Sequence, residues 1–187
     1  PSSLIFYLGI NQTIPNLKHH TLFFENDLDK HIDCIYGEKK WPEKPLFYAC
    51  CPSKTDKIVA PKGKENLFLL MPLAINIQDD EKNREKYIAE MLSRIEKHTG
   101  VADLASKIEY QRSYCVTDFV QDYNAYGGNA YGLANTLNQT AVLKPKMRNK
   151  KVNNLFYTGQ LTVPGPGVPP SIISGKIVAN EITKFKN

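Results

Sequence analysis

The sequence predicts an α+β fold: a mixed, largely antiparallel sheet with flanking helices, followed near the carboxyl end by a strand, a loop and a helix. Short apolar runs bounded by turn residues recur along residues 3–115, which is typical of strands. One long amphipathic pattern interrupts these runs, and a segment rich in glycine and proline precedes the last helical pattern. These three observations define the fold class.

Five segments have the length and composition of strands. A short polar loop separates the first two, and we expect the second to run antiparallel to the first. The adjacent histidines His19 and His20 should alternate in direction along a strand, so at most one can face a ligand cavity. We interpret both as hydrogen-bonded structural residues. The five segments are Ser3–Ile10, His19–Glu25, Leu46–Cys50, Leu67–Pro72 and Ile108–Cys115.

Three helices are predicted before the glycine-rich loop. The first spans Asn26–Tyr36, with Asn26 or Asp27 as its cap. The clearest spans Asp79–His98, and Gly100 is its natural end. A short third helix runs to Tyr123. The apolar positions of the first helix are Leu28, Ile32 and Ile35. Those of the second helix are Tyr87, Ile88, Met91, Leu92 and Ile95. The cap of the third helix is Thr117 or Asp118.

The composition describes a chain with enough apolar residues for a core and with no export or membrane-spanning signal. Of its 187 residues, 42% are hydrophobic, and the formal net charge is +5. This weak positive charge is compatible with an anionic membrane surface. Acidic residues offset the basic ones on the long helix, which argues against a nucleic-acid site. We therefore expect a cytoplasmic protein, peripheral to the inner membrane, and the start at Pro1 suggests a fragment.

No metal site is predicted, because the four cysteines show no paired metal spacing and are interpreted as reduced thiols. The cysteines are Cys34, Cys50, Cys51 and Cys115. A basic loop precedes the last predicted strand, and we interpret its side chains as solvated rather than bound to lipid headgroups. Its members are Lys144, Lys146, Arg148, Lys150 and Lys151.

The carboxyl end combines a short apolar run, a loop and a helix. Residues 155–157 are expected to form a strand buried on both faces, and Gly165 and Gly167 leave the loop backbone open to close approach. Pro169 and Pro170 suit the first helical turn. This arrangement suits an anionic or carbonyl-rich ligand, although an ordinary strand-to-helix corner would look the same. The residues expected to face a core are Ile172, Ile173, Ile177 and Ile182.

The order of residues in 159–179 resembles the carboxyl-terminal flavin-binding segment of the bacterial phytoene desaturase (carotenoid desaturase) family, within the FAD-dependent amine oxidase-like superfamily. The family pattern is G-x-G-T-H-P-G-x-G-V-P-G followed by a helix of small residues. Matching residues are Gly159, Thr162, Pro164, Gly165, Gly167, Val168 and Pro169. Departures are Gln160, Leu161, Val163 and Pro170, with Val163 where many members carry His.

Other segments extend the resemblance to residues 3–179. Residues 7–24 resemble the hairpin of the family's substrate domain, and Thr117-Asp118-Phe119 resembles its T-P-x-D-F motif. Residues 126–145 resemble a segment that the family places beside the isoalloxazine ring and the substrate. The resemblance implies a substrate- or lipid-binding portion in 1–145, with a mixed substrate-domain sheet. It also implies that 146–187 are the terminal strand, loop and helix of a Rossmann-like FAD-binding domain.

The resemblance assigns the cofactor FAD to the loop before the last helix. The cofactor-binding residues it implies are Gly159, Gln160, Thr162, Gly165, Gly167, Val168 and Pro169. No catalytic acid or base can be named. Because the sequence holds no βαβ unit with a G-x-G-x-x-G loop, we expect this chain alone to bind FAD weakly or not at all. The terminal strand would lack its sheet neighbours, which favours homo-oligomers.

The implied activity is that of a carotenoid-biosynthesis oxidoreductase, with the chain as its carboxyl-terminal part. Such an enzyme introduces double bonds into a C30 or C40 polyene by hydride transfer to flavin. A related carotenoid ketolase or oxidase, an isomerase or a retinol saturase would share these motifs. A non-enzymatic module that binds hydrophobic ligands or membranes is a further alternative.

Overall fold

The computed structural model describes residues 1–134, 136–140 and 143–186. The chain divides into two compact units, Pro1–Ala130 and Tyr131–Asn187. The predicted α+β class is confirmed, with four α-helices and a five-stranded sheet in the described residues. The predicted domain division at residue 145 concerns a longer protein and stays a prediction. Asn135, Ala141 and Val142, within the segment likened to the flavin-proximal one, lie outside the described residues.

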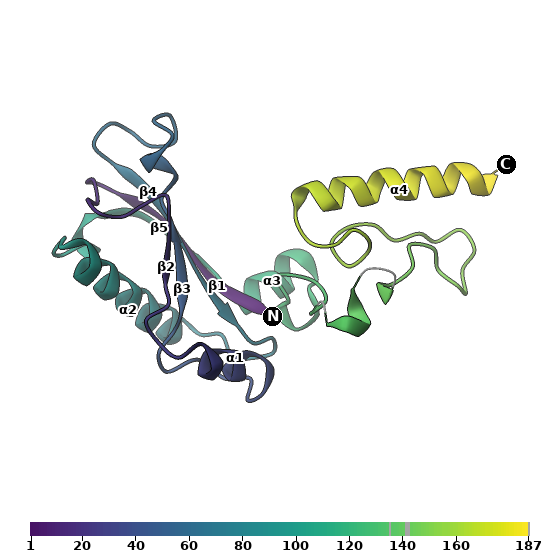
Figure 1. Cartoon of the computed structure of the whole chain (residues 1–187), viewed down its shortest axis with the longest axis horizontal. Helices are drawn as coiled ribbons and strands as arrows, with labels where there is room; N and C mark the ends of the chain where they lie inside the picture. The colour runs from purple at the N-terminus through teal and green to yellow at the C-terminus, as the bar shows by residue number, and fades with distance from the viewer. Residues whose placement is uncertain (135, 141–142, 187) are drawn as a thin grey trace. The chain divides into compact units, whose positions relative to one another are not determined.

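Every strand pair in the described sheet is antiparallel, and the strand order is β2-β3-β4-β1-β5 (Figure 1). The sheet is therefore antiparallel rather than mixed. The long strands β1 and β4 pair along their whole length, from Ser2 opposite Leu73 to Ile10 opposite Glu65. The strands are β1 (Ser2–Ile10), β2 (His20–Phe23), β3 (Phe47–Cys50), β4 (Glu65–Leu73) and β5 (Ile108–Tyr114).

Strand β2 runs antiparallel to β1, as predicted, but the expected hairpin between them is wrong, because β4 and β3 lie between β1 and β2. The connection between them is not a polar turn: Ile14 and Leu17 are buried in it, with 0% and 4% of their surface exposed. The Ile14 N–H also donates to the Glu65 carboxylate on β4 over 3.2 Å. Burial of these two side chains stabilises the connection where it passes the neighbouring strands on its way to the sheet edge.

One face of the sheet packs against helix α2 (Glu81–Thr99), and this packing forms the core of the first unit. Alternate residues of β4 are buried, as period-two alternation predicts for a sheet covered on one face. The predicted apolar stripe of α2 is confirmed, since all five of its residues are buried. Asp80 caps the helix by accepting the Asn83 N–H over 2.8 Å, and Gly100 ends it in the left-handed conformation.

Helix α1 (Leu28–Tyr36) begins at the predicted Asp27 cap but buries a different face from the one expected. Leu28 and Ile32 are 48% and 40% exposed, whereas His31 and Cys34 are buried. The His31 ring explains this orientation. Its Nδ1 accepts the Leu46 N–H and its Nε2 donates to the Pro72 carbonyl, both over 2.9 Å. Burial lowers the pKa of His31, which favours the neutral ring that both contacts require.

Helix α3 (Val116–Tyr123) begins earlier than predicted, with Cys115 as its cap. Asp118 is the third helical residue and accepts the Cys115 N–H over 2.8 Å, as in a capping box. Short 3₁₀ turns occur at Pro52–Lys54, Ala105–Lys107, Tyr126–Gly128 and Leu137–Gln139.

The second unit contains helix α4 (Val168–Lys186) but not the predicted buried strand at 155–157. Phe156 forms an isolated antiparallel bridge to Arg148, while Leu155 and Tyr157 are 39% and 42% exposed. In α4, Ile172 and Ile173 are exposed, and among residues 168–184, whose burial is described, Ser174 and Val178 are buried. The helix therefore buries a polar residue, Ser174.

No helix within the described residues is both long enough and apolar enough to cross a bilayer.

Adjacent leucines on β4 test the one-sided core. Leu69 has no exposed surface, whereas Leu70 points to the opposite face and is partly exposed. Leu69→Ala should lower the free energy of unfolding by about 2–5 kcal/mol. Leu70→Ala should lower it by about 1 kcal/mol. Urea denaturation measures both, and equal losses would contradict the assignment of the two faces.

Candidate functional site

A buried serine joins the predicted cofactor loop to helix α4. Ser174 Oγ lies 2.7 Å from Thr158 Oγ1, accepts the Gly159 N–H over 2.8 Å, and donates to the Ser171 carbonyl over 2.7 Å. Its side chain has no exposed surface. These three contacts satisfy a hydroxyl out of water and explain why α4 turns Ser174 inward. They also fix where the loop begins relative to the helix.

Thr162 closes the first turn of the same loop. Its N–H and its hydroxyl both donate to the Gly159 carbonyl, over 3.1 and 2.9 Å, and only 2% of the residue is exposed. With both polar groups engaged inside the loop, Thr162 sets the loop's shape. Gln160 and Val168, by contrast, are exposed.

The two central glycines have backbone conformations that other residues rarely adopt. The φ angle is +139° at Gly165 and +114° at Gly167. A β-carbon at Gly167 would also lie 3.3 Å from Pro170 Cδ. The glycine spacing of the loop is therefore required by its fold, and it leaves the exposed Gly167 backbone without a side chain.

The amino end of α4 is a weaker anion site than the sequence pattern predicts. Pro169 and Pro170 have no N–H, and the Ser171 N–H donates to the Gly167 carbonyl over 3.0 Å. Of the first three helical residues, only Val168 retains an N–H. A flat ring with a few carbonyl groups suits so few donors better than a phosphate does.

Within the second unit, two residues of the 126–145 segment, Gly132 and Lys144, lie beside this loop. A β-carbon at Gly132 would lie 3.2 Å from the Gln160 carbonyl oxygen, and one at Gly165 would lie 3.5 Å from Lys144 Nζ. Lys144 is only 7% exposed, so its predicted solvation is wrong, whereas Lys146, Arg148, Lys150 and Lys151 are exposed as predicted. Sequence reasoning missed the burial of Lys144 because this residue is the first in a run of basic residues whose other members are exposed.

The first unit exposes an apolar sheet face opposite α2, which we call the open face. The strand register aligns a row of side chains across it, so that neighbours in the row lie opposite one another. Tyr7 and Phe68 lie beside this row with ring centroids 5.4 Å apart. Five strands at ordinary spacing give the row a length of roughly 19 Å. Its members are Leu22, Tyr48, Leu70, Ile5 and Tyr114.

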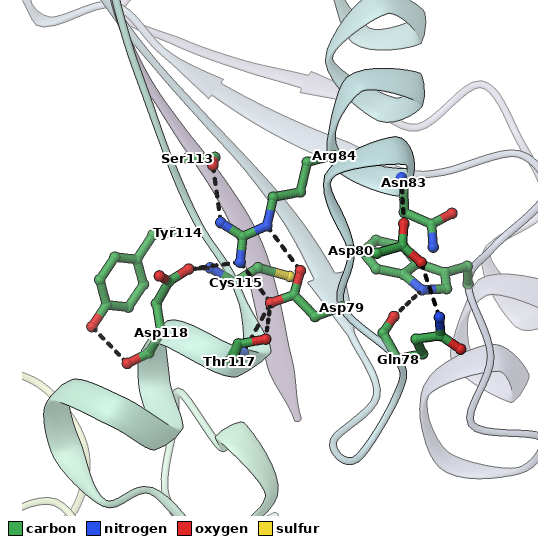
Figure 2. Close-up of polar contacts among 11 residues, drawn as sticks. Gln78, Asp79, Asp80, Asn83, Arg84, Ser113, Tyr114, Cys115, Thr117 and Asp118 are labelled. Atoms are coloured by element: carbon green, nitrogen blue, oxygen red, sulfur yellow. Dashed lines mark hydrogen bonds and ion pairs between the residues drawn. The ribbon is translucent and has the colours of Figure 1, made fainter.

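An arginine on α2 connects this helix to β5 and α3 (Figure 2). Arg84 contacts the Asp79 carboxylate through Nε and Nη2, over 2.8 and 2.6 Å. Its Nη2 also donates to Asp118 over 2.8 Å, and its Nη1 to the Ser113 hydroxyl over 3.0 Å. Thr117 completes the network by donating its N–H and its hydroxyl to Asp79. Only 13% of the Arg84 side chain is exposed.

The charges of this network are stabilised by their partners. The hydrogen bond from Arg84 to Asp79 raises the pKa of the guanidinium. Burial alone would raise the pKa of Asp79, but hydrogen bonds from Arg84 and Thr117 outweigh burial and hold it below its ordinary value. A permanently paired arginine of this kind holds elements in position and does not transfer protons. The Thr117-Asp118 motif therefore has a structural role here.

Replacing Arg84 should destabilise the first unit strongly, because the Asp79 side chain is only 1% exposed and would lose its counter-ion. Arg84→Met is expected to lower the free energy of unfolding by about 3–5 kcal/mol. Lys82→Met, on an exposed position of the same helix, serves as the control and should change it by at most about 0.5 kcal/mol. Thermal and urea denaturation measure the difference. A loss below 1 kcal/mol, on the order of a surface pair, would mean that the network contributes little.

His19 and His20 do not show the predicted alternation of side chains along a strand. His19 precedes β2, so strand alternation does not apply to it, and the two rings lie 4.2 Å apart. The predicted hydrogen bonds are confirmed: His19 Nδ1 lies 2.6 Å from Thr55 Oγ1, and His20 Nδ1 lies 2.6 Å from the Tyr48 hydroxyl. Cys50, which pairs with His20 across β2 and β3, lies beside them. Sequence spacing gave no signal for this grouping.

Comparison with known proteins connects these features to one group. No family model matches the chain. A carotenoid 3,4-desaturase of Haloarcula japonica is 44% identical over 182 residues, which cover 97% of this chain and 37% of that protein. A zeta-carotene-forming phytoene desaturase of Myxococcus xanthus is 32% identical over 97% of this chain and 35% of its own. A 4,4'-diaponeurosporene oxygenase of Staphylococcus haemolyticus is 28% identical over 99% of this chain and 37% of its own.

The chain spans little more than a third of the length of these relatives. The matches nevertheless cover nearly all of its own residues, in both compact units. The resemblance stated from the sequence is thus confirmed. This chain is homologous over nearly its whole length to the phytoene and carotenoid desaturases.

Proposed function

We propose that this chain is the carboxyl-terminal part of an FAD-dependent carotenoid desaturase, and that its open face binds the polyene. The observation that carries the proposal is the apolar row across that face, in a chain 44% identical to a carotenoid 3,4-desaturase. Desaturation is preferred to oxygenation because two desaturases, at 44% and 32% identity, are more similar to the chain than the oxygenases, at 27–30%. Oxygenation is the second candidate.

The open face supplies what a long apolar substrate needs. Leu22 is 62% exposed and Tyr7 43%, and Leu70 lies in the row between Tyr48 and Ile5. A contiguous apolar patch of this kind is costly in water and favours a bound partner. Because the row has no charged member, it can bind a hydrocarbon and exclude water. Binding of the hydrocarbon would then not depend on directional bonds.

The loop before α4 is the proposed contact to the flavin. Its fit rests on the exposed backbone of Gly167, which carries no side chain, and on the remaining Val168 N–H. Gly165 and Lys144 are buried beside each other and would support the shape of the loop. Bound FAD would accept the hydride that is removed from an allylic carbon of the polyene, and loss of a proton from the neighbouring carbon would complete the new double bond. These residues would orient the ring and stabilise negative charge on it. The other proposed contacts are Gly159, Gln160 and Pro169. Thr162, the remaining predicted cofactor residue, would act through the shape of the loop, because both its polar groups donate to the Gly159 carbonyl.

The dinucleotide part of FAD needs a different structure. Its pyrophosphate is ordinarily bound at a parallel βαβ unit, and all strand pairs among the described residues are antiparallel. We propose that the rest of a longer protein supplies this unit. Attachment to an anionic membrane surface through the exposed basic residues, and homo-oligomerisation, stay predictions.

A charge on the open face should block substrate use without unfolding the protein. In the natural longer protein, Leu70→Glu is expected to lower the conversion of phytoene or a later carotene about tenfold or more, since it removes the burial of a leucine. Ile58→Glu is the matched control, because Ile58 is 90% exposed in a loop outside the strands. Chromatography and absorption spectra identify the products. Equal activity of the two variants would contradict the proposed face, and oxygenated products would favour the second candidate.

A second test separates the flavin contact from the substrate face. Gly165→Ala in the longer protein should lower flavin affinity about tenfold, because a side chain strains the loop at this φ angle. Gly63→Ala is the control, since Gly63 also has positive φ, +81°, but has no atom within 4 Å of its β-position. Flavin absorbance after reconstitution with FAD is the measurement. Absence of flavin from the unaltered longer protein would overturn the flavoenzyme proposal itself.

A further inference from the structure

We propose that His19, His20 and Cys50 form a binding site for a borderline-soft divalent metal ion, Zn²⁺ in the first place, that ties the edge strand β2 to β3. One ligand atom from each of these three side chains lies within 4.8 Å of those from the other two. The residues come from the loop before β2, from β2 itself and from β3. The inference is independent of the proposed flavin chemistry.

Each histidine engages Nδ1 in a hydrogen bond, so Nε2 is the nitrogen that we assign to the metal. His19 Nδ1 contacts the Thr55 hydroxyl and His20 Nδ1 the Tyr48 hydroxyl, each over 2.6 Å. With the proton on Nδ1, each ring donates to its hydroxyl partner and keeps the lone pair on Nε2 for coordination. Histidine ligands of metals ordinarily have such a partner on the other nitrogen, because it fixes the tautomer and the ring orientation.

The donor set selects the class of metal. Two imidazoles and a thiolate suit Zn²⁺ and related transition metals, and they do not suit Ca²⁺ or Mg²⁺, which take oxygen ligands. In a tetrahedral zinc site the ligand atoms lie roughly 3.5 Å apart. His20 is exposed, and His19 and Cys50 are partly exposed, so small side-chain rotations can close the remaining distance. Three protein ligands leave a fourth position for water.

The place of the site in the sheet gives the metal a role. Of the described strands, β2 is an edge strand of only four residues and pairs with β3 alone. His20 and Cys50 lie directly opposite each other in that pair. A metal ion bound by both would cross-link the strand ends, and its binding free energy would add to the stability of this edge.

The first experiment uses the unaltered chain and compares alkylation of its four cysteines with and without Zn²⁺, by peptide mass mapping. Zn²⁺ should slow the alkylation of Cys50 about tenfold or more and leave Cys34 unchanged. Cys34, Cys51 and Cys115 are buried, so each should react more slowly than Cys50 both with and without Zn²⁺. No protection of Cys50, or equal protection of Cys34, would overturn the proposal.

The second experiment replaces Zn²⁺ by Co²⁺, whose charge-transfer absorption reports a bound thiolate. One Co²⁺ per chain should give this band, and Cys50→Ser should abolish it. Tyr48→Phe removes the hydroxyl that contacts both His20 and Cys50 and should weaken binding about tenfold. Cys34→Ser is the matched control and should retain the band. Retention of the band in Cys50→Ser would contradict the site. If Cys50→Ser fails to fold, as circular dichroism would show, the alkylation result decides.

Discussion

The antiparallel pairing of β1 with β4, with α2 packed on one face, is the constraint on which the first unit depends. The two strands pair along nine residues each, and their alternate side chains divide into a buried set and an open set. A slip of one residue would exchange the two sets and expose the core, so the register is strongly determined. The positions of β5 and β3, and through β3 that of β2, follow from this central pair.

Polar contacts then fix the elements that apolar patterning leaves undetermined. Arg84 joins the start of α2 to Asp118 of α3 and to Ser113 of β5. His31 joins α1 to the backbone beside β3 and within β4. Ser174 has the same function in the second unit, where it fixes the glycine loop on α4. In each case one side chain satisfies two or more partners out of water, so its rotation determines the orientation of a whole helix.

This division explains how far the sequence alone could predict the molecule. Helix α2 and strand β4 were predicted well, because long periodic patterns report burial directly. The buried faces of α1 and α4 were not, because His31 and Ser174 are buried for their hydrogen bonds and count as polar in any periodicity. The loop glycines could be predicted, since their backbone conformation is a local property. The grouping of His20 with Cys50 depends on contact between residues far apart in the chain. The burial of Lys144 depends on its surroundings in the fold, which a local sequence pattern does not report.

The alternation of β4 also has a consequence for how such a protein diversifies. Its odd-numbered residues, such as Leu69, are buried and contribute to the stability of the fold, while its even-numbered residues, such as Leu70, line the open face. Substitutions in the second set can reshape a binding surface at little cost to stability. Homologous chains can therefore acquire different ligand preferences through neighbouring positions of one strand, while the inherited scaffold stays intact.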